Sequence, residues 1–266
     1  MTRSGIAPGV ALVTGAGQRL GREMALYLAR RGFSVAFHYA TSRDGAEEAA
    51  AEARRLGVRA VALQADLLDD AATGALLPAA ASALGGPVTV LVNSASIFEY
   101  DTIHTATRES WDRHIGSNLR APFLLTQAMA AQELAPDLSG GEPRATGLIV
   151  NIIDQRVQKL TPEFMTYTIA KMGLWAMTRT TAQALAPAIR VNAIGPGPTL
   201  RGIRQSEEHF ARQRASTILE RGADPSDIVA ALGFFLDSPS VTGQLICADG
   251  GQHLGWKTPD ILGVET

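Results

Sequence analysis

The fold is decided by the stretch Val10-Ala-Leu-Val-Thr-Gly-Ala-Gly-Gln-Arg-Leu-Gly21, in which an apolar run leads through a glycine-rich turn into a helical pattern. In a dinucleotide-binding βαβ unit, Gly15 would permit a tight turn, Gly17 a close approach of the backbone to a pyrophosphate, and Gly21 close helix packing. The amino end of the following helix would then face the phosphate charge. The spacing GxGxxxG differs by one residue from GxGxxG, but its place between a first strand and a first helix predicts a dinucleotide site.

Short apolar runs alternate with helical patterns along the rest of the 266 residues. This alternation predicts an α/β fold: a single domain with a doubly wound parallel sheet of Rossmann type, about seven strands and helices on both faces. The chain length suits one large domain of this kind. We expect strands at 10–14, 34–39, 58–63, 88–93, 147–153, 190–194 and 244–248, and helices at 20–31, 44–56, 70–84, 111–134, 164–186 and 226–236.

Two segments interrupt the alternation. Residues 136–143 are polar and rich in proline and glycine, which predicts a surface loop. Residues 196–224 are charged and follow the sixth strand. Their place beside the carboxyl ends of the strands makes them a candidate substrate lid, although an ordinary solvated helical excursion fits equally well.

The bulk composition excludes several classes of protein. Hydrophobic residues make up 46% of the chain and the net charge is −2, which favours a soluble globular protein over an electrostatic binder of nucleic acid. No apolar run is long enough to span a membrane. The single cysteine, Cys247, excludes an internal disulfide, and residues 1–9 lack the apolar core of a secretory signal, so we expect a cytoplasmic protein. The five histidines show no metal-binding spacing, so no metal site is expected.

The end of the second strand indicates which dinucleotide binds. A carboxylate about 20 residues after the glycine turn would bind the ribose 2′-hydroxyl of NAD, and none ends this strand. Instead, His38, Thr41, Ser42 and Arg43 could contact a 2′-phosphate, and Arg19 adds positive charge. The sequence therefore favours NADP, although these polar residues could simply solvate a loop.

Polar or small residues also follow the third and fourth strands. Asp66 could accept a hydrogen bond from an adenine amino group or cap the following helix. The small residues of Asn93-Ser-Ala-Ser96 would let a flat cofactor lie against the backbone.

A tyrosine and a lysine supply the clearest chemical signal. Tyr167 and Lys171 are four residues apart on an expected helix and therefore lie on one face. An ammonium close to a phenol should lower the phenol's pKa and make it a usable proton donor near neutral pH. Asp154 would lie close by, at the carboxyl end of the apolar strand 147–153, where open α/β sheets bind ligands.

Taken together, these motifs resemble the short-chain dehydrogenase/reductase family over essentially the whole chain. The glycine turn, Asn93-Ser-Ala95, Ser117-Asn118, the Tyr167 and Lys171 pair, and Pro196-Gly197 occur in the family's order. The resemblance implies one NAD(P)-binding domain, hydride transfer and usually a homotetramer. It also implies that Asn118 and Lys171 connect the tyrosine to solvent through water, and that the lysine holds the nicotinamide ribose.

One position departs from the family pattern. The family normally has a serine where Asp154 stands, 13 residues before the tyrosine. An aspartate there resembles the pteridine reductases, as do Arg19, His38-Tyr39 and the tail 249–256. In that branch a phenylalanine in the place of Phe98 stacks a pterin against nicotinamide.

The chemistry of an aspartate explains why the departure matters. An ionised carboxylate would repel the negative charge that develops on oxygen during carbonyl reduction, so Asp154 argues against ordinary ketone reduction unless it stays protonated. The same carboxylate can accept from the amino and N–H groups of a dihydropterin. We therefore expect an NADPH-dependent reductase of a C=N bond in a pterin-type substrate, with Asp154 and Tyr167 delivering the proton. The alternatives are a reductase of another carbonyl or imine and, less in keeping with an intact Tyr167 and Lys171 pair, a non-catalytic NADPH-binding regulator.

The expected site residues fall into three groups. The candidate catalytic residues are Asp154, Tyr167, Lys171 and Asn118. The candidate substrate-binding residues are Arg19, Ser96, Phe98, Asp154 and Tyr167. The candidate cofactor-binding residues are Gly15, Gly17, Arg19, Leu20, Gly21, His38, Tyr39, Thr41, Ser42, Asp66, Leu67, Asn93, Ser94, Ala95, Tyr167, Lys171, Pro196 and Gly197. Tetramer contacts are expected from the helices 111–134 and 164–186 and from the last strand with the tail 254–266, and no nucleic-acid or membrane partner is expected.

Overall fold

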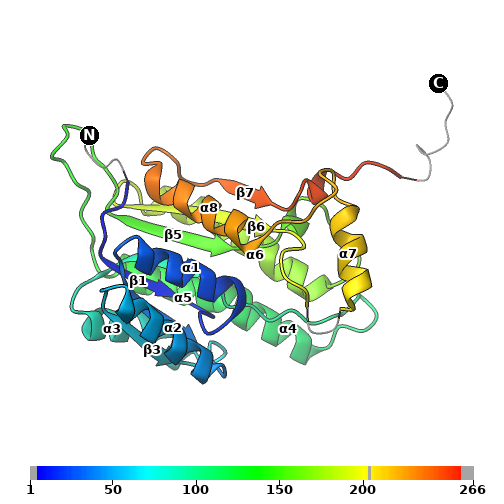
Figure 1. Cartoon of the computed structure of the whole chain (residues 1–266), viewed down its shortest axis with the longest axis horizontal. Coiled ribbons are helices and arrows are strands. Elements are labelled where there is room, and N and C mark those ends of the chain that lie inside the picture. Colours follow the sequence, from blue (N-terminus) through cyan, green and yellow to red (C-terminus); the bar gives the residue numbers. More distant parts are fainter. Residues whose placement is uncertain (1–4, 203–204, 259–266) are drawn as a thin grey trace.

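The computed structural model describes residues 5–202 and 205–258, and its core is one parallel seven-stranded sheet (Figure 1). The strand order is β3-β2-β1-β4-β5-β6-β7, which confirms the doubly wound α/β fold. The strands are β1 Val10–Val13, β2 Ser34–Tyr39, β3 Ala60–Gln64, β4 Val88–Asn93, β5 Gly147–Ile152, β6 Ile189–Pro196 and β7 Leu245–Ala248.

Helices cover both faces of this sheet, with α1, α2 and α8 on one face and α3, α5 and α6 on the other (Figure 1). The α-helices are α1 Arg19–Arg30, α2 Arg43–Arg55, α3 Asp70–Leu84, α4 Arg108–Ile115, α5 Ala121–Ala130, α6 Met165–Ala184, α7 Glu207–Ala215 and α8 Pro225–Asp237. Short helical turns lie at η1 Gly116–Arg120, η2 Gln155–Val157 and η3 Gln252–Leu254.

Alternate strand residues divide the core into two layers. Ala11 and Val13 pack toward α1, whereas Val10 and Leu12 pack toward α3 and α5. Successive side chains of a strand point to opposite faces, so a strand buried on both faces is apolar throughout. This is why the central strands are continuous apolar runs. The last strand, β7, is only partly buried because it forms an edge of the sheet, and Cys247 on it is likewise partly buried.

The helix expected at 111–134 is three segments. Helix α4 begins earlier because Thr107 and Ser110 exchange side-chain-to-backbone hydrogen bonds of 3.0 Å in a capping box. A π-helical turn, η1, then separates α4 from α5, and α5 ends at Ala130 rather than Leu134. Turns of this type occur frequently at functional sites.

The segment 196–224 contains a helix that the sequence analysis did not place. This helix, α7, has no buried residue and lies at the end of the molecule toward which the strands point (Figure 1). Arg214 of α7 donates to the carbonyl groups of Pro198 (3.0 Å) and Ala223 (2.6 Å), which fastens it to both ends of the segment. Residues 203–204 of the segment, like the tail residues 259–266, lie outside the described residues.

The junction of β1 and α1 tolerates no side chain at Gly21. A Cβ atom there would lie 2.2 Å from the carbonyl oxygen of Gly15. We predict that Gly21→Ala lowers the free energy of unfolding by about 1–3 kcal/mol, the usual cost of overpacking a buried contact. Urea denaturation measures the change.

Gly74 in α3 provides a matched control for this substitution. A Cβ atom there meets no heavy atom within 4 Å, and the backbone is helical. Gly74→Ala should leave stability unchanged or raise it by up to about 1 kcal/mol, because alanine is the better helix former. Equal midpoints for the two variants would contradict the packing argument.

Candidate functional site

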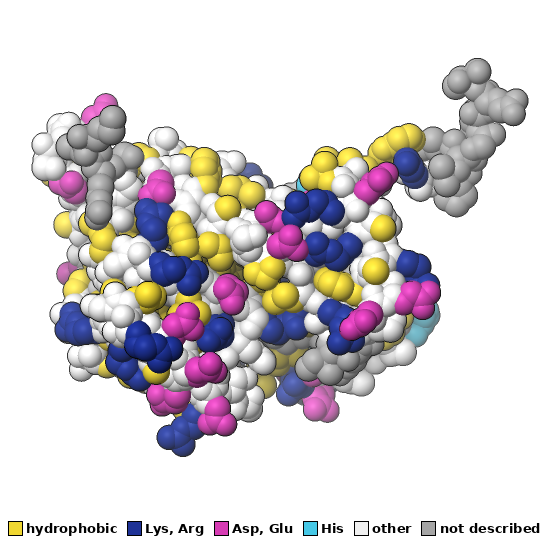
Figure 2. Space-filling model, in the orientation of Figure 1, with side chains coloured by type: hydrophobic (Ala, Val, Ile, Leu, Met, Phe, Trp, Pro, Cys, Tyr) yellow, Lys and Arg dark blue, Asp and Glu magenta, His cyan; other side chains and the backbone are white. Residues whose placement is uncertain are grey.

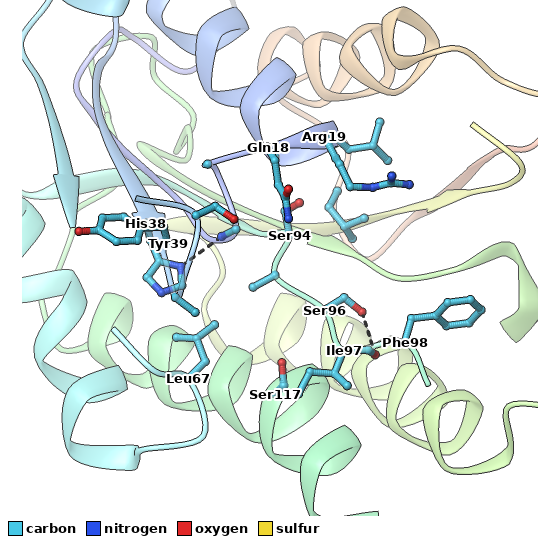
Figure 3. Close-up of a pocket in the computed structure, with 18 of the residues that line it drawn as sticks. Gln18, Arg19, His38, Tyr39, Leu67, Ser94, Ser96, Ile97, Phe98 and Ser117 are labelled. Carbon is cyan, nitrogen blue, oxygen red and sulfur yellow. Dashed lines mark hydrogen bonds between the residues drawn. The ribbon is translucent and has the colours of Figure 1, made fainter. Parts of the chain in front are cut away.

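A cavity of about 860 Å³ opens at the carboxyl ends of the central strands (Figure 3). His38 and Tyr39 lie at one end of it and Phe98 at the other. The cavity collects every expected site residue except Asn93 and Asn118, which lie behind its wall. Residues that line it but were not expected are Gln18, Ala40, Gln64, Leu68, Ile97, Arg113, Ser117, Ile152 and Ile153. Most are sequence neighbours of expected residues, and Arg113 and Ser117 lie four apart on the stretch that carries Asn118.

The glycine turn forms the floor of the cavity. Gly15 has a left-handed backbone with φ 66°, and a Cβ atom there would lie 2.9 Å from the Cα of Ala95. Gly21 packs against this turn, as expected. Gly17 lines the cavity, and a Cβ atom there would lie 2.6 Å from the carbonyl oxygen of Ser42, so this glycine also admits the start of α2; its approach to a pyrophosphate stays a prediction. The second left-handed residue is Arg19, with φ 53°.

The structure gives His38 a different role from the one expected, which was contact with the 2′-phosphate. It is 1% exposed, and its Nδ1 accepts from the backbone N–H of Gly15 at 3.1 Å. Its Nε2 lies 3.2 Å from the carbonyl oxygen of Ala65 and therefore carries the proton. Burial lowers the pKa of His38, so the ring stays neutral. Its hydrogen bond from the backbone N–H of Gly15 holds the glycine turn in place.

With His38 buried, other residues after β2 are left to contact a dinucleotide. Thr41 and Ser42 line the cavity, and Arg43 begins α2 but does not line it. Asp66 also lines the cavity and accepts from the backbone N–H of Leu68 at 3.0 Å. It does not cap α3, because that role falls to Asp69.

A buried polar network holds the strand ends beside the turn. The hydroxyl of Thr14 accepts from the backbone N–H groups of Ser94 (2.9 Å) and Ala95 (3.0 Å). Behind them, the amide of Asn93 donates to that of Asn151 at 2.8 Å. Asn93 therefore supports the cavity wall and does not line it.

Asp154 and Tyr167 form the chemical centre of the cavity. The Tyr167 hydroxyl donates to Oδ2 of Asp154 at 3.0 Å, and Oδ1 accepts from the backbone N–H of Arg156 at 2.8 Å. Lys171 is buried and its Nζ donates to the carbonyl oxygen of Ile152 at 2.9 Å. Its ammonium lies 5.6 Å from the centre of the Tyr167 ring.

The pKa of Tyr167 is shifted opposite to the expected direction. Burial and the neighbouring Asp154 charge raise it well above 10.0, and the ammonium of Lys171 does not offset them. Burial also raises the pKa of Asp154 above its ordinary value, against the opposing effects of Arg156, Tyr167 and Lys171. Burial lowers the pKa of Lys171 to about 8. The site therefore holds a neutral phenol bonded to a carboxylate rather than a phenolate.

Asn118 holds a segment of the cavity wall. It lies in the π-turn η1, and its side-chain amide exchanges hydrogen bonds of 2.8 and 2.9 Å with the backbone of Ile97. This side chain is therefore occupied, and a route for protons through it stays a prediction.

Phe98 forms an exposed aromatic wall, 51% exposed, next to the tyrosine. Its ring stacks on Phe164 at 4.3 Å and meets the edge of Tyr167 at 4.7 Å. Phe164 was not expected at the site, but it lies one residue before α6 and one turn before Tyr167, which places it on the same side of the helix. The guanidinium of Arg156 lies 5.0 Å from the centre of the Phe164 ring, within the range of a cation–π contact.

Arg19 joins the glycine turn to the segment 196–224. Its guanidinium donates to the carbonyl groups of Arg201 (2.9 Å) and Leu200 (3.0 Å). Pro196 and Gly197 enter the cavity wall where β6 ends, and a Cβ atom at Gly197 would lie 2.6 Å from Asp249. The start of this segment is thus tied down at both sides of the cavity.

Two other features were not found in the described part of the chain. It contains no cluster of histidine, cysteine, aspartate or glutamate side chains suited to a metal ion. None of its helices combines the length and apolarity that a membrane crossing requires. Acidic and basic side chains intermingle over the face seen in Figure 2.

Comparisons with known proteins agree with this architecture. Residues 15–253 match the family model described as enoyl-(acyl carrier protein) reductase. The chain is similar to FolM alternative dihydrofolate reductase 1 of Brucella canis, solved in complex with NADP, with 41% identity, a TM-score of 0.88 and coverage of 98% of this chain and 100% of that one.

Curated relatives carry other names. The 3-oxoacyl-(acyl-carrier-protein) reductase FabG of Staphylococcus epidermidis is 30% identical over 249 residues, which covers 92% of this chain and 98% of that protein. A short-chain type dehydrogenase/reductase of Picea abies is 30% identical over 257 residues, covering 91% and 92%. The extent of these matches, together with the geometry of the site, shows that the chain belongs to the short-chain dehydrogenase/reductase family.

Proposed function

We propose that this protein is an NADPH-dependent reductase that adds hydride to a C=N bond of a pterin-type substrate. The observation that carries the proposal is the Asp154 carboxylate, hydrogen-bonded by Tyr167 in a cavity walled by the exposed ring of Phe98. The similar Brucella canis protein, called an alternative dihydrofolate reductase, supports a substrate of this class.

The residues present fit a bound dinucleotide. Helix α1 points its amino end at the cavity, has no acidic residue in its first turn, and its N-cap Gln18 makes no side-chain capping bond. Its first N–H groups are therefore open to phosphate oxygens. Gly15, Ser94 and Ala95 would hold the rest of the dinucleotide, and Thr41 and Ser42 at the start of α2 would meet a 2′-phosphate. When bound, the nicotinamide supplies the hydride.

The carboxylate of Asp154 sets the class of substrate. A serine in this place would donate to a carbonyl oxygen, whereas an ionised aspartate can only accept hydrogen bonds. A pterin ring presents an amino group and N–H groups along one edge, which match such an acceptor. The 30% identical FabG relative keeps carbonyl reduction as the second candidate, and Asp154 argues against it in its ionised form.

The same pair would deliver the proton that the reduced nitrogen requires. Burial raises the pKa of Asp154, so the carboxyl group can carry a proton at a pH closer to neutrality than an exposed aspartate. Tyr167 donates to Oδ2 and would return a proton to the carboxyl group as the phenol takes one up in turn, so that no phenolate is left. Lys171, with a pKa lowered to about 8, would bind the nicotinamide ribose and keep the local charge balanced.

Phe98 would provide the stacking surface for the substrate. Its ring is exposed on the cavity side and is held from behind by Phe164. A flat heteroaromatic ring stacked on it would present one edge to Asp154, and ring pairs of this kind contribute about 0.5–1.5 kcal/mol beyond the area they bury.

Assembly, a moving lid and location belong to the same proposal. Apolar side chains remain exposed on α5 and α6, including Phe123 at 45% and Ile169 at 40%, as a homotetramer would require.

Residues 196–224 would cover the substrate, with Arg19 as a point of attachment. We expect the cytoplasm as the location.

The cofactor assignment predicts a measurable preference. NADPH should exceed NADH in kcat/KM by at least about tenfold, roughly 1.4 kcal/mol. Ser42→Asp should reverse the order, because a carboxylate at the start of α2 repels a 2′-phosphate and can bind a 2′-hydroxyl. Initial rates with both cofactors measure this. Glu163→Asp, in the exposed loop before α6 and away from the cavity lining, is the control and should keep the wild-type ratio. Equal efficiency of the wild type with both cofactors would sink the assignment.

The substrate assignment predicts the effect of restoring the usual family residue. Asp154→Ser should lower kcat/KM for dihydropterin or dihydrofolate by about 10²-fold or more, because it removes the proton-delivering carboxyl. It should leave the KM for NADPH within about threefold. The measurement is NADPH oxidation with these substrates and with simple ketones.

The two substrate types separate the candidates. A gain of ketone reduction in Asp154→Ser, with loss of pterin reduction, is the expected pattern. Undiminished dihydropterin turnover in this variant, or ketone reduction alone by the wild type, would favour the carbonyl reductase. Absence of turnover with any substrate would favour a non-catalytic NADPH-binding regulator.

A further inference from the structure

The segment that carries Phe98 is fastened on both sides of this residue. The amide of Asn118 binds both backbone groups of Ile97. On the other side, the backbone N–H of Glu99 donates to Nε2 of His114 at 3.1 Å. Arg113 also forms an ion pair with the Glu99 side chain at 2.9 Å. The Phe98 side chain itself remains exposed, so the position of its backbone is set by the attachments of Ile97 and Glu99.

His114 is a fully buried group for which the proposed reaction has no use. Its exposure is 0%. Because Nε2 accepts from Glu99, the proton of the neutral ring lies on Nδ1, which donates to Oγ1 of Thr166 at 2.7 Å. The Thr166 hydroxyl then donates to the carboxylate of Asp101. In this series of hydrogen bonds, from Glu99 through His114 and Thr166 to Asp101, each donor and acceptor is therefore defined.

The chain of hydrogen bonds joins the segment 97–101 to the start of α6. Asp101 accepts from the backbone N–H of Thr166 at 3.1 Å and from the Ser110 hydroxyl at 3.2 Å. Thr166 directly precedes Tyr167, and the His114 ring meets the edge of the Tyr167 ring at 6.0 Å. The stacking wall and the tyrosine are therefore tied to one buried framework.

We propose that His114 and Thr166 are positioning residues that fix the segment of Phe98 relative to Tyr167, whose ring Phe98 contacts at 4.7 Å, and thereby set where the stacking surface for the substrate lies. The inference rests on the proposed function, because a flat ring stacked on Phe98 must lie at a fixed place to present its edge to Asp154. Neither residue contacts the substrate. Their effect should appear in substrate binding and leave NADPH binding unchanged.

The framework requires a neutral imidazole. Protonation of Nε2 would remove the acceptor for Glu99 and release one side of the segment. The charged groups around His114 are Asp101 and Glu99, which raise its pKa, and Arg113, which lowers it, with the phenol of Tyr167 at the ring edge. Burial is the largest effect and places the pKa below the ordinary 6.5. The segment should therefore loosen only when the pH falls through this lowered pKa, below 6.5.

The experiment compares four proteins: wild type, His114→Leu, Thr166→Val and Thr166→Ser. Leucine removes both ring nitrogens, valine removes only the hydroxyl, and serine restores the hydroxyl. Steady-state kinetics give the KM for dihydropterin and for NADPH from pH 5 to pH 8, the range in which histidine titrates. Hydrogen exchange followed by mass spectrometry, without substrate, reports the mobility of the peptide spanning 97–101.

We expect His114→Leu and Thr166→Val to raise the KM for dihydropterin about tenfold, the effect of one lost buried hydrogen bond. Thr166→Ser should stay within about twofold of the wild type, and the KM for NADPH should stay within about twofold in all four. Exchange should quicken in 97–101 and stay unchanged in the β-strands. The rise in dihydropterin KM at acid pH should disappear in His114→Leu, because no group is left there to protonate.

Unchanged exchange of 97–101 in His114→Leu would overturn the proposal, and so would faster exchange with an unchanged KM for dihydropterin. A general loss of folding would differ from both, because exchange would rise throughout the chain and Thr166→Ser would still report on the hydroxyl. If the wild type turned over no pterin, the proposed function would fail and the fixed position of Phe98 would lose its stated purpose. The exchange data would still decide whether His114 fastens the segment.

Discussion

The hydrogen bond from the Tyr167 hydroxyl to the Asp154 carboxylate is the interaction on which the chemistry of this site depends. It joins the end of β5 to the first turn of α6 at 3.0 Å, with Tyr167 buried and Asp154 partly buried. A serine there would be a second donor, so the pair would face a substrate oxygen. With a carboxylate the pair becomes an acceptor and a proton carrier, and the pKa values of both groups rise. The identity of one side chain thus changes the substrate class that a common fold accepts.

Two buried neutral histidines organise the two ends of the cavity in the same way. His38 accepts from the backbone N–H of Gly15 in the glycine turn, and His114 accepts from that of Glu99 beside Phe98. Each ring uses its other nitrogen to bind a second element, and burial lowers the pKa of both. A neutral imidazole suits this task because it combines one donor and one acceptor in a rigid plane.

The sequence was sufficient to predict the sheet, because strands buried on both faces are apolar throughout and the glycine turn has a fixed place in a βαβ unit. The bounds of β2, β4 and α3 agree with expectation. Asp154, Tyr167 and Lys171 meet in one cavity for the same reason: strand ends and helix faces follow from periodicity. The role of His38, the π-turn at Asn118 and the pKa of Tyr167 could not be predicted, because they depend on which groups burial brings together from distant parts of the chain.

The most direct test of this account is the ionisation of Tyr167. Tyrosinate absorbance in a pH titration, taken as the difference between the wild type and Tyr167→Phe, isolates this one phenol among the four tyrosines. The account predicts no ionisation of Tyr167 below pH 10.0, and a lower pKa in Asp154→Ser once the carboxylate charge is gone. Ionisation of Tyr167 near neutral pH in the wild type, or the same pKa in Asp154→Ser, would contradict it.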